Sequence, residues 1–366
     1  MGPIRIAVVI GKISYGGIEN VVANYYRVID KSKVQFDFYY GGNSLENPKQ
    51  EFLDLGARYF KLPPVEKPLA FKREFRQYLK KNIYKIVHVH MNTLSFLAID
   101  VAWKEGVPIR ICHNHSVPSG EAFFKKILKN SLKFLCTIHA TDMFACSEKS
   151  GRWFYGNKVY DQGKVHLMSN AIDLNRFHYS EDKRCEIRKK LNIQDKLVIG
   201  HVGRFTYAKN HLFLLDVFSE VLTKAPNAVL VLVGDGELKT SILKKIKDLN
   251  LQDKVILVGQ SETPEYYYLA FDVMAFPSVF EGLPVTVVEC QASLRPIVVS
   301  DVVPDEAIFS DGVYRCSLDK GPSAWAEQII ATAGKLVRVD ERKNLYDIFV
   351  QAQNLCSWYV EKASEI

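Results

Sequence analysis

The sequence lacks any long apolar segment. A membrane-spanning helix needs about 18–20 consecutive apolar residues, and the longest pure apolar runs here are short, such as Ala228–Val233. The stretch Ile4–Ile10 is too short for a secretory signal, and neither a basic start nor a small-residue cleavage site accompanies it. Met1-Gly2 is not followed by the Ser or Thr at position 6 that favours myristoylation. We therefore expect a cytoplasmic protein.

Paired cysteine motifs are missing as well. The chain has 7 cysteines, an odd number, and no two of them have CxxC spacing. Most of them sit inside apolar stretches. We therefore expect reduced cysteines in the core of a cytosolic protein, rather than disulfides or a zinc site.

Charge of one sign does not dominate, although the balance is basic. The 366 residues carry a formal net charge of +7, concentrated in the first half. No basic stripe accompanies a recognised nucleic-acid-binding motif, so nucleic acid is not an expected partner. The stretch Phe123–Leu135 interleaves lysines with aromatic and aliphatic residues. It could rest peripherally on an anionic membrane, or it could be an amphipathic helix packed on a sheet, and the sequence leaves both open.

Short apolar runs alternate with amphipathic helical stretches along most of the chain. This alternation predicts parallel sheets with crossover helices, an α/β fold. The expected strands are Ile4–Ile10, Val34–Tyr40, Ile86–His90, Ile109–Cys112, Met143–Cys146, Val165–Met168, Leu197–Val202, Val229–Val233, Val255–Val258, Val273–Ala275 and Ile297–Val299. The expected helices include Glu19–Val28, Thr93–Glu105, Glu121–His139, His211–Thr223, Leu238–Asn250 and Pro284–Ser293. We expect two Rossmann-like, doubly wound domains facing a central cleft, joined near residues 170–184, with the chemistry in loops after strands.

The most specific motif is the string from Glu281 to Glu289, which follows the expected strand Val273–Ala275. Gly282 lets a ligand approach the backbone. The amides of Gly282 and Leu283 would point at an acceptor oxygen near a helix N-terminus. Glu281 would lie at the mouth of a site, and Glu289 could accept hydrogen bonds from a ribose diol. An isolated glutamate pair would be unremarkable on a helix, but the whole string after this loop predicts a site.

A second motif, Gly203–Asn210, directly follows the expected strand Leu197–Val202. Arg204 and Lys209 place two cations at the carboxyl end of that strand. Arginine can fork onto phosphate oxygens and lysine acts as a point charge, so the pair suits an anion. Taken alone, the segment is equally consistent with a solvated basic loop.

Two glycine turns are weaker signals. Gly16 and Gly17 follow the first strand and offer bare amides to a phosphate or a sugar. They do not form a GxGxxG fingerprint, and a simple tight turn remains an equal alternative. The string Gly234–Glu237 is interpreted as a strand-to-helix turn, not as a metal-binding acidic motif.

Four histidines lie at or after strand ends. Strand alternation places His88 and His90 on one face, and His113 and His115 follow in the next expected strand and its loop. Four histidines suggest zinc, but no cysteine or carboxylate set completes such a site, so no metal is expected. A loop histidine that hydrogen-bonds a sugar hydroxyl is the simpler role, for His115 or, failing that, His113.

Together these motifs resemble the family 4 glycosyltransferases of the GT-B fold, most of all the bacterial exopolysaccharide and capsule enzymes. The resemblance covers nearly the whole chain. Its pieces are Gly16–Glu19, Arg110–Ser116, Ala145–Glu148, Asn170–Asp173, the loop with Arg204 and Lys209, and Glu281–Glu289, with the family's spacing of its two glutamates. It implies an acceptor-binding domain at 1–175, a donor-binding domain at 176–345, and a last helix at 346–366 that packs back on the first domain.

The resemblance also implies an activity. The chain would be a retaining hexosyltransferase that moves a sugar from a nucleotide-diphosphate sugar, with UDP favoured, to a glycan or lipid-linked acceptor, without a cofactor or metal. The leaving phosphate would take the acceptor proton. The implied ligands are Arg204 and Lys209 for the diphosphate, Glu289 for the ribose, Glu281 and His115 beside the donor sugar, and Gly16 and Gly17 near the phosphates and acceptor.

One departure from the family pattern concerns the loop after the second glutamate. The family usually has Ala-x-Gly-x-Pro there, whereas Ala292–Pro296 carries Leu294 in place of the glycine. We expect this loop to pack differently, although no proposed ligand is lost.

Two other functions remain as alternatives. A nucleotide-sugar epimerase can have a similar two-domain shape, but it would turn over the donor without an acceptor and change the stereochemistry of the sugar. A non-catalytic nucleotide-sugar-binding protein would bind without turnover. The apparently complete motif set favours the transferase.

Overall fold

The computed structural model describes residues 2–11, 17–42, 44, 49–115 and 132–366. Gly16 and most of the stretch 123–135, two of the sequence predictions, lie outside these residues. The chain forms two compact units. Unit 1 comprises Met1–Ile172 and Asn344–Ile366, and unit 2 comprises Asp173–Lys343.

Unit 1 contains one parallel sheet of seven strands in the order β3-β2-β1-β4-β5-β6-β7. The strands are β1 (Ile4–Ile10), β2 (Val34–Gly41), β3 (Arg58–Leu62), β4 (Ile86–His90), β5 (Ile109–Asn114), β6 (Asp142–Ala145) and β7 (Val165–Leu167). The order reverses direction between β1 and β4, which is where open α/β sheets bind ligands beyond their carboxyl ends.

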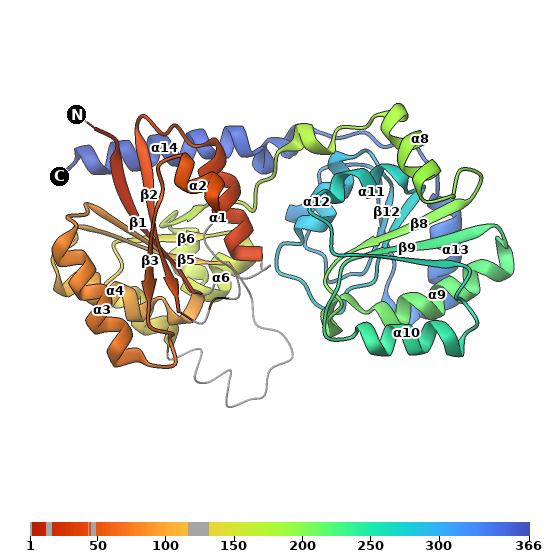
Figure 1. Cartoon of the computed structure of the whole chain (residues 1–366), viewed down its shortest axis with the longest axis horizontal. Helices are drawn as coiled ribbons and strands as arrows, with labels where there is room; N and C mark the ends of the chain where they lie inside the picture. The colour runs from red at the N-terminus through yellow and green to blue at the C-terminus, as the bar shows by residue number, and fades with distance from the viewer. Residues whose placement is uncertain (1, 12–16, 43, 45–48, 116–131) are drawn as a thin grey trace. The chain divides into compact units, whose positions relative to one another are not determined.

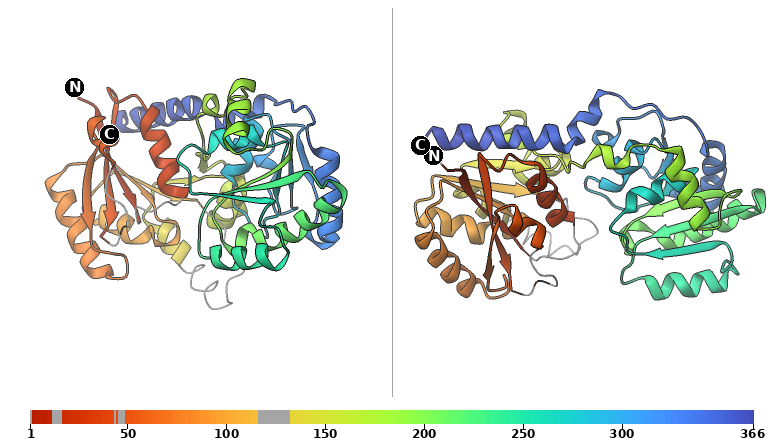
Figure 2. Two further views of the ribbon diagram at one scale, coloured as in Figure 1. Left: turned by 45° about the vertical axis from the view of Figure 1, so that its right-hand side comes forward. Right: turned by 45° about the horizontal axis from the view of Figure 1, so that its top comes forward.

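Helices cover both faces of this sheet. The helices α1 (Gly17–Val28), α2 (Gln50–Asp54) and α14 (Ile348–Ser364) share a core with one face, and α3 (Pro68–Lys81), α4 (Phe96–Lys104) and α6 (Glu148–Tyr155) share a core with the other. The short helix α7 (Asn157–Asp161) follows α6. The C-terminal helix α14 packs against α1 and β2 and runs along unit 1 in every view (Figure 1 and Figure 2). Both ends of the chain therefore contribute to unit 1.

Unit 2 contains a second parallel sheet, of six strands in the order β10-β9-β8-β11-β12-β13. The strands are β8 (Leu197–Val202), β9 (Ala228–Val233), β10 (Val255–Gly259), β11 (Val273–Phe276), β12 (Ile297–Val299) and β13 (Val313–Arg315). One face shares a core with α9 (His211–Lys224), α10 (Lys239–Asp248) and α13 (Gly321–Thr332). The helices α8 (Glu181–Lys190), α11 (Pro264–Ala270) and α12 (Val285–Ala292) complete the unit, and α11 contacts β8 while α12 contacts β12.

The predicted α/β fold with two doubly wound sheets is confirmed, and each strand expected from the sequence is present within two residues of its predicted bounds. Two strands were not predicted. Both β3 and β13 are edge strands with charged residues, and such strands lack the continuous apolar run of a strand buried on both faces. Helix α12 begins at Val285, so Pro284 is its N-cap and not its first helical residue as predicted. Among the described residues, no helix is long and apolar enough to cross a membrane.

Candidate functional site

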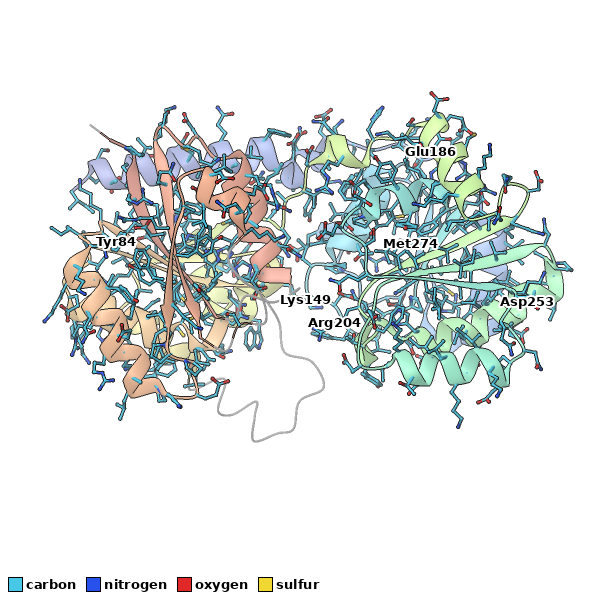
Figure 3. All side chains as sticks on the ribbon, viewed as in Figure 1. Tyr84, Lys149, Glu186, Arg204, Asp253 and Met274 are labelled. Atoms are coloured by element: carbon cyan, nitrogen blue, oxygen red, sulfur yellow. The ribbon has the colours of Figure 1, made fainter. Side chains whose placement is uncertain are left out.

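The loop that carries Arg204 is fixed by backbone hydrogen bonds to the turn after β9. The amide of Gly203 donates to the carbonyl of Val233 at 3.0 Å, and that of Phe205 donates to the carbonyl of Asp235 at 2.9 Å. The Phe205 ring is buried and anchors the loop, while Arg204 is exposed at the carboxyl edge of the second sheet (Figure 3).

Two glycines of the turn after β9 lie against the backbone of this loop. Gly234 has φ +145, and a Cβ there would lie 2.1 Å from the carbonyl oxygen of Gly203. At Gly236 a Cβ would lie 2.6 Å from the carbonyl oxygen of Phe205. The string Gly234–Glu237, interpreted from the sequence only as a turn, therefore allows the close approach of two backbones that holds Arg204 in place.

Lys209 and Glu281, which the sequence assigned to different parts of a ligand, form an ion pair in this structure. The Nζ of Lys209 lies 2.6 Å from Oε1 of Glu281, and the two side chains are only 17% and 10% exposed. The same Nζ lies 4.6 Å from the centre of the Phe276 ring. A backbone bond from the amide of Val279 to the carbonyl of Ala208, 2.9 Å long, ties the two loops together. The cation and the carboxylate are thus held at one place before any ligand binds.

Buried neutral groups lie next to Lys209. His201 contacts the carbonyl of Ala275 through Nδ1 at 2.8 Å and packs edge-on against His211, with ring centres 4.5 Å apart. Burial lowers the pKa of His201 to about 4 and that of His211 to about 2, so both rings are neutral at physiological pH. Within the described residues, Nε2 of His201, both ring nitrogens of His211 and Oγ of Ser278 have no hydrogen-bond partner. This group was not predicted from the sequence, where its only signal is the polar residues at the ends of β8 and β11.

The backbone between Glu281 and helix α12 is open to a ligand at one point. A Cβ added to Gly282 would meet nothing within 4 Å, whereas Leu283 is buried and fixes the loop. The carbonyl of Pro284 accepts a hydrogen bond from the amide of Val287 at 3.0 Å, at the start of helix α12. The glycine therefore leaves space beside Glu281 rather than serving a tight turn.

Glu289 lies in α12 and is oriented by a residue that sequence analysis did not identify. The hydroxyl of Tyr268, a fully buried residue of α11, donates to Oε2 of Glu289 at 2.6 Å. Burial raises the pKa of Glu289 to about 7, against the opposing effects of the Tyr268 hydrogen bond and of Arg176. Glu289 is therefore a carboxyl group that titrates near neutral pH, which is typical of functional sites.

Leu294 follows α12 in a backbone conformation that favours glycine. Its φ is +55, in the left-handed region. A residue with a Cβ pays roughly 1–2 kcal/mol for this conformation.

Replacing Leu294 with glycine should stabilise unit 2. The strain released exceeds the extra chain entropy of glycine, roughly 0.5–1 kcal/mol, so we expect a net gain of about 0.5–1 kcal/mol and a rise in thermal midpoint of ~1–4 °C. Leu294→Asn, which tolerates the left-handed region, should give a smaller rise. A midpoint that falls in both variants in calorimetry would show that packing of the leucine side chain outweighs its backbone strain.

Unit 1 brings together all four histidines noted in the sequence. His90 Nδ1 lies 2.8 Å from His115 Nε2, and His88 Nε2 lies 3.1 Å from His113 Nδ1. His88 Nδ1 also contacts the hydroxyl of Tyr359 in α14 at 2.5 Å. Burial lowers the pKa of His115 to about 3, and it lowers the pKa of each of the other three well below its ordinary value. The cluster is thus neutral and reaches from α14 to the carboxyl edge of the first sheet.

Three of these histidines could be considered as metal ligands. His88, His90 and His113 each offer a ring nitrogen, and these nitrogens lie within 4.8 Å of one another. However, the rings of His88 and His90 are stacked 4.1 Å apart and inclined by 24°. The lone pairs of an imidazole lie in the ring plane, so two stacked rings direct them side by side and not towards one ion. The arrangement fits a hydrogen-bonded stack better than a tetrahedral metal site.

Two family models match the chain. The model described as "Glycosyltransferase Family 4" matches residues 15–176, and that described as "Glycosyl transferases group 1" matches residues 183–333. The putative glycosyltransferase EpsF of Bacillus subtilis is 36% identical over 359 residues, which cover 95% of this chain and 93% of that protein.

Other relatives have more specific names. A UDP-Gal:alpha-D-GlcNAc-diphosphoundecaprenol alpha-1,3-galactosyltransferase of Escherichia coli is 27% identical over 270 residues, 70% of this chain and 69% of that protein. Others are named for capsular polysaccharide biosynthesis in Staphylococcus aureus and amylovoran biosynthesis in Erwinia amylovora. The crystal structure of Anabaena Alr3699/HepE in complex with UDP-glucose is similar with a TM-score of 0.71, covering 98% of this chain and 96% of that chain at 16% identity. At that identity the likeness concerns the fold alone.

Proposed function

The chain belongs to the family 4 glycosyltransferases of the GT-B fold, and from this premise we propose that it transfers a sugar from a UDP-sugar to a glycan or lipid-linked acceptor with retention of configuration. Unit 2 binds the donor in this proposal, and unit 1 binds the acceptor. The observation that carries it is the Lys209–Glu281 pair at the carboxyl edge of the second sheet, 2.6 Å from nitrogen to oxygen, with Arg204 exposed at the same edge.

Arg204 and Lys209 bind the diphosphate in the proposed complex. Their charges neutralise the negative charge that develops on the leaving diphosphate, which is the task a metal ion performs in other transferases. A diphosphate that takes Lys209 as its partner leaves Glu281 beside the sugar. In this proposal the leaving phosphate, and not Glu281, takes the proton of the acceptor.

Glu289 binds the ribose in this proposal, because it is a carboxylate acceptor oriented by Tyr268. UDP is favoured as the carrier, and the relative from Escherichia coli whose name gives UDP-Gal and a diphosphoundecaprenol-linked acceptor supports both the carrier and the acceptor class.

The nucleotide site can be tested by calorimetric titration with UDP, GDP and ADP, each with and without EDTA. We expect micromolar binding of UDP that EDTA does not change, because two protein cations supply the positive charge. Loss of binding in EDTA with recovery on adding Mg²⁺ or Mn²⁺ would contradict metal independence. No binding of any of the three nucleotides would contradict the site itself.

A peripheral membrane location belongs to the same proposal, since a lipid-linked acceptor lies at a membrane surface. It is supported by the exposure of Phe134, Leu135 and Ile138, at 68%, 43% and 49%. We expect the protein to float with vesicles that contain anionic phospholipid and to dissociate in high salt. Equal recovery with neutral and anionic vesicles, or with neither, would exclude this surface as an electrostatic contact.

A further inference from the structure

His201 has one fixed tautomer in the interior of unit 2. It lies in strand β8, and its side chain is fully buried. Its Nδ1 is 2.8 Å from the carbonyl oxygen of Ala275. A carbonyl can only accept, so Nδ1 carries the proton of the neutral ring and Nε2 is left as a bare acceptor. Nε2 has no hydrogen-bond partner among the described residues. A buried acceptor without a donor is costly, so a donor is expected at this place.

The space next to this bare nitrogen is shared with Lys209. A Cβ added to Gly203 would lie 3.1 Å from Nε2 of His201 and 3.5 Å from both Cγ and Cδ of Lys209. Nζ lies two bonds beyond Cδ, so rotation about the last bonds of the lysine side chain can bring its ammonium group towards His201. The ring of Phe276 borders both groups, because it is stacked with the ring of His201 at 5.7 Å between centres and lies 4.6 Å from Nζ of Lys209.

The ammonium group of Lys209 has hydrogen-bond donors to spare. An ammonium group carries three N–H donors. Within the part of the chain that the structure describes, one of them has a partner, Oε1 of Glu281 at 2.6 Å. The side chain of Lys209 is 17% exposed, so water has limited access to the others. His201 differs from Glu281 in being neutral. It can therefore hold the ammonium group without cancelling the charge that attracts an anion.

We propose that His201 is a positioning residue whose Nε2 accepts a hydrogen bond from the Lys209 ammonium group when a diphosphate displaces Glu281 as the partner of that lysine. This inference rests on the proposed function, because the diphosphate is that of the nucleotide-sugar donor. The remaining N–H groups of the lysine then face the diphosphate, while Nε2 restricts the lysine to one orientation. His201 acts through Lys209 and does not contact the donor. All three residues belong to unit 2.

The first experiment needs no ligand. It records the ring nitrogens of His201 in the full-length protein, labelled with ¹⁵N-histidine, by long-range ¹H–¹⁵N correlation. Glu281→Ala removes the carboxylate, so we expect the Lys209 ammonium group to turn to His201 and the Nε2 signal to move upfield, as an acceptor nitrogen does when it gains a hydrogen bond. The double variant Glu281→Ala/Lys209→Met has no ammonium group and should lack this change. An Nε2 signal that is the same in the single and the double variant would overturn the inference.

The second experiment measures the Kd for UDP by titration calorimetry in two variants of opposite design. His201→Asn keeps an amide N–H near the former Nδ1 for the carbonyl of Ala275 but has no acceptor in place of Nε2. His201→Gln places its amide oxygen near the former Nε2. We expect UDP affinity to fall roughly tenfold, about 1.4 kcal/mol, in His201→Asn and to recover largely in His201→Gln. A residue that merely supports the fold through Ala275 would give the reverse order, and that order would overturn the inference.

A double-mutant cycle tests whether the effect passes through the lysine. In the Lys209→Met background, His201→Asn should cause no further loss of UDP affinity, because the bond that it removes is already absent. An equal loss with and without Lys209 would contradict the positioning role. His211→Phe is the matched control, since His211 is equally buried and packs edge-on against His201 with ring centres 4.5 Å apart. We expect no coupling between His211 and Lys209, and an equal coupling would remove the assignment to His201.

Failure of this inference and failure of the proposed function give different results. If no nucleoside diphosphate binds the wild-type protein, the proposed donor is wrong, and the nitrogen shifts measured without ligand still decide whether His201 accepts from Lys209. If UDP binds the wild-type protein and the His201 variants with equal affinity, His201 does not position the lysine, and the proposed function stands.

Discussion

Replacing Lys209 with methionine should lower kcat/KM for sugar transfer on the order of 100-fold. Methionine keeps much of the length of the side chain and removes its charge. The Nζ of Lys209 is already placed, 2.6 Å from Glu281 and 4.6 Å from the Phe276 ring centre, so little reorganisation is needed when negative charge grows on the leaving diphosphate. A preorganised cation of this kind stabilises the transition state more than the ground state. We therefore expect the loss chiefly in kcat.

The ion pair requires a control for stability. Lys209→Met leaves the carboxylate of Glu281 without its cation in a largely buried place, so part of any loss could come from local disorder. Lys224→Met is a matched variant, because Lys224 forms a 2.7 Å ion pair with Glu327 on the exposed surface of the same unit. We expect it to leave the rate and thermal midpoint unchanged within error. The double variant Lys209→Met/Glu281→Gln has no unpaired charge at this place.

Initial rates and calorimetric midpoints of these variants decide the assignment. If Lys209→Met and the double variant are equally slow while the double variant melts as wild type does, the missing charge and not disorder explains the loss. A rate for Lys209→Met that stays within twofold of wild type would remove Lys209 from the transition state. Full recovery in the double variant would mean that the unpaired glutamate, and not the absent lysine, caused the defect.

The parts of the fold set by local pattern could be predicted from the sequence. Runs such as Ala228–Val233 are buried on both faces of a parallel sheet, so apolar content alone marks them as strands. Motifs after strands also collect at one edge, because parallel strands end together. From that rule we expected Arg204, Lys209 and Glu281 at one edge of unit 2. The family and the GT-B fold that these motifs resemble are confirmed. The edge strands β3 and β13, which carry charged residues, have no comparable signal.

Contacts between side chains distant in sequence could not be predicted in this way. The sequence indicated Lys209 for the phosphates and Glu281 for the sugar, but not that the two would pair, since their 72-residue separation is closed only by the fold. Tyr268 has the appearance of an ordinary aromatic residue in a short helix until α11 brings its hydroxyl onto Glu289. In the same way, the hydrogen bonds among the stacked histidines of unit 1 depend on the pairing of β4 with β5.

The titration of Glu289 leads to the second large effect, a donor affinity that depends on pH. The ribose hydroxyls donate to a carboxylate far better than to a carboxyl group, so binding favours the deprotonated form. With a pKa of about 7, raised by burial, this group is mostly protonated below neutral pH. We expect the affinity for a UDP-sugar to be constant above about pH 8 and to fall about tenfold for each pH unit below 7. UDP-sugars suit the measurement because their diphosphate has no ionisation between pH 5.5 and 8.

The variant Glu289→Gln should bind weakly and lose this dependence. Hydrogen bonds to a charged group contribute about 1.5–3 kcal/mol, so affinity at pH 8 should fall roughly 10–150-fold. Tyr268→Phe is a complementary variant. The Tyr268 hydrogen bond lowers the pKa of Glu289, so its removal should raise that pKa further and move the fall in affinity to higher pH.

The effect of pH on folding stability through Glu289 is opposite in sign to its effect on donor binding. A carboxyl whose folded pKa is raised favours the folded state most below its unfolded pKa and loses that contribution as pH rises through about 7. Titration calorimetry and thermal midpoints from pH 5.5 to 8 therefore give two independent readings of one group. If affinity is flat with pH in wild type, or still falls in Glu289→Gln, the group that binds the ribose is not Glu289.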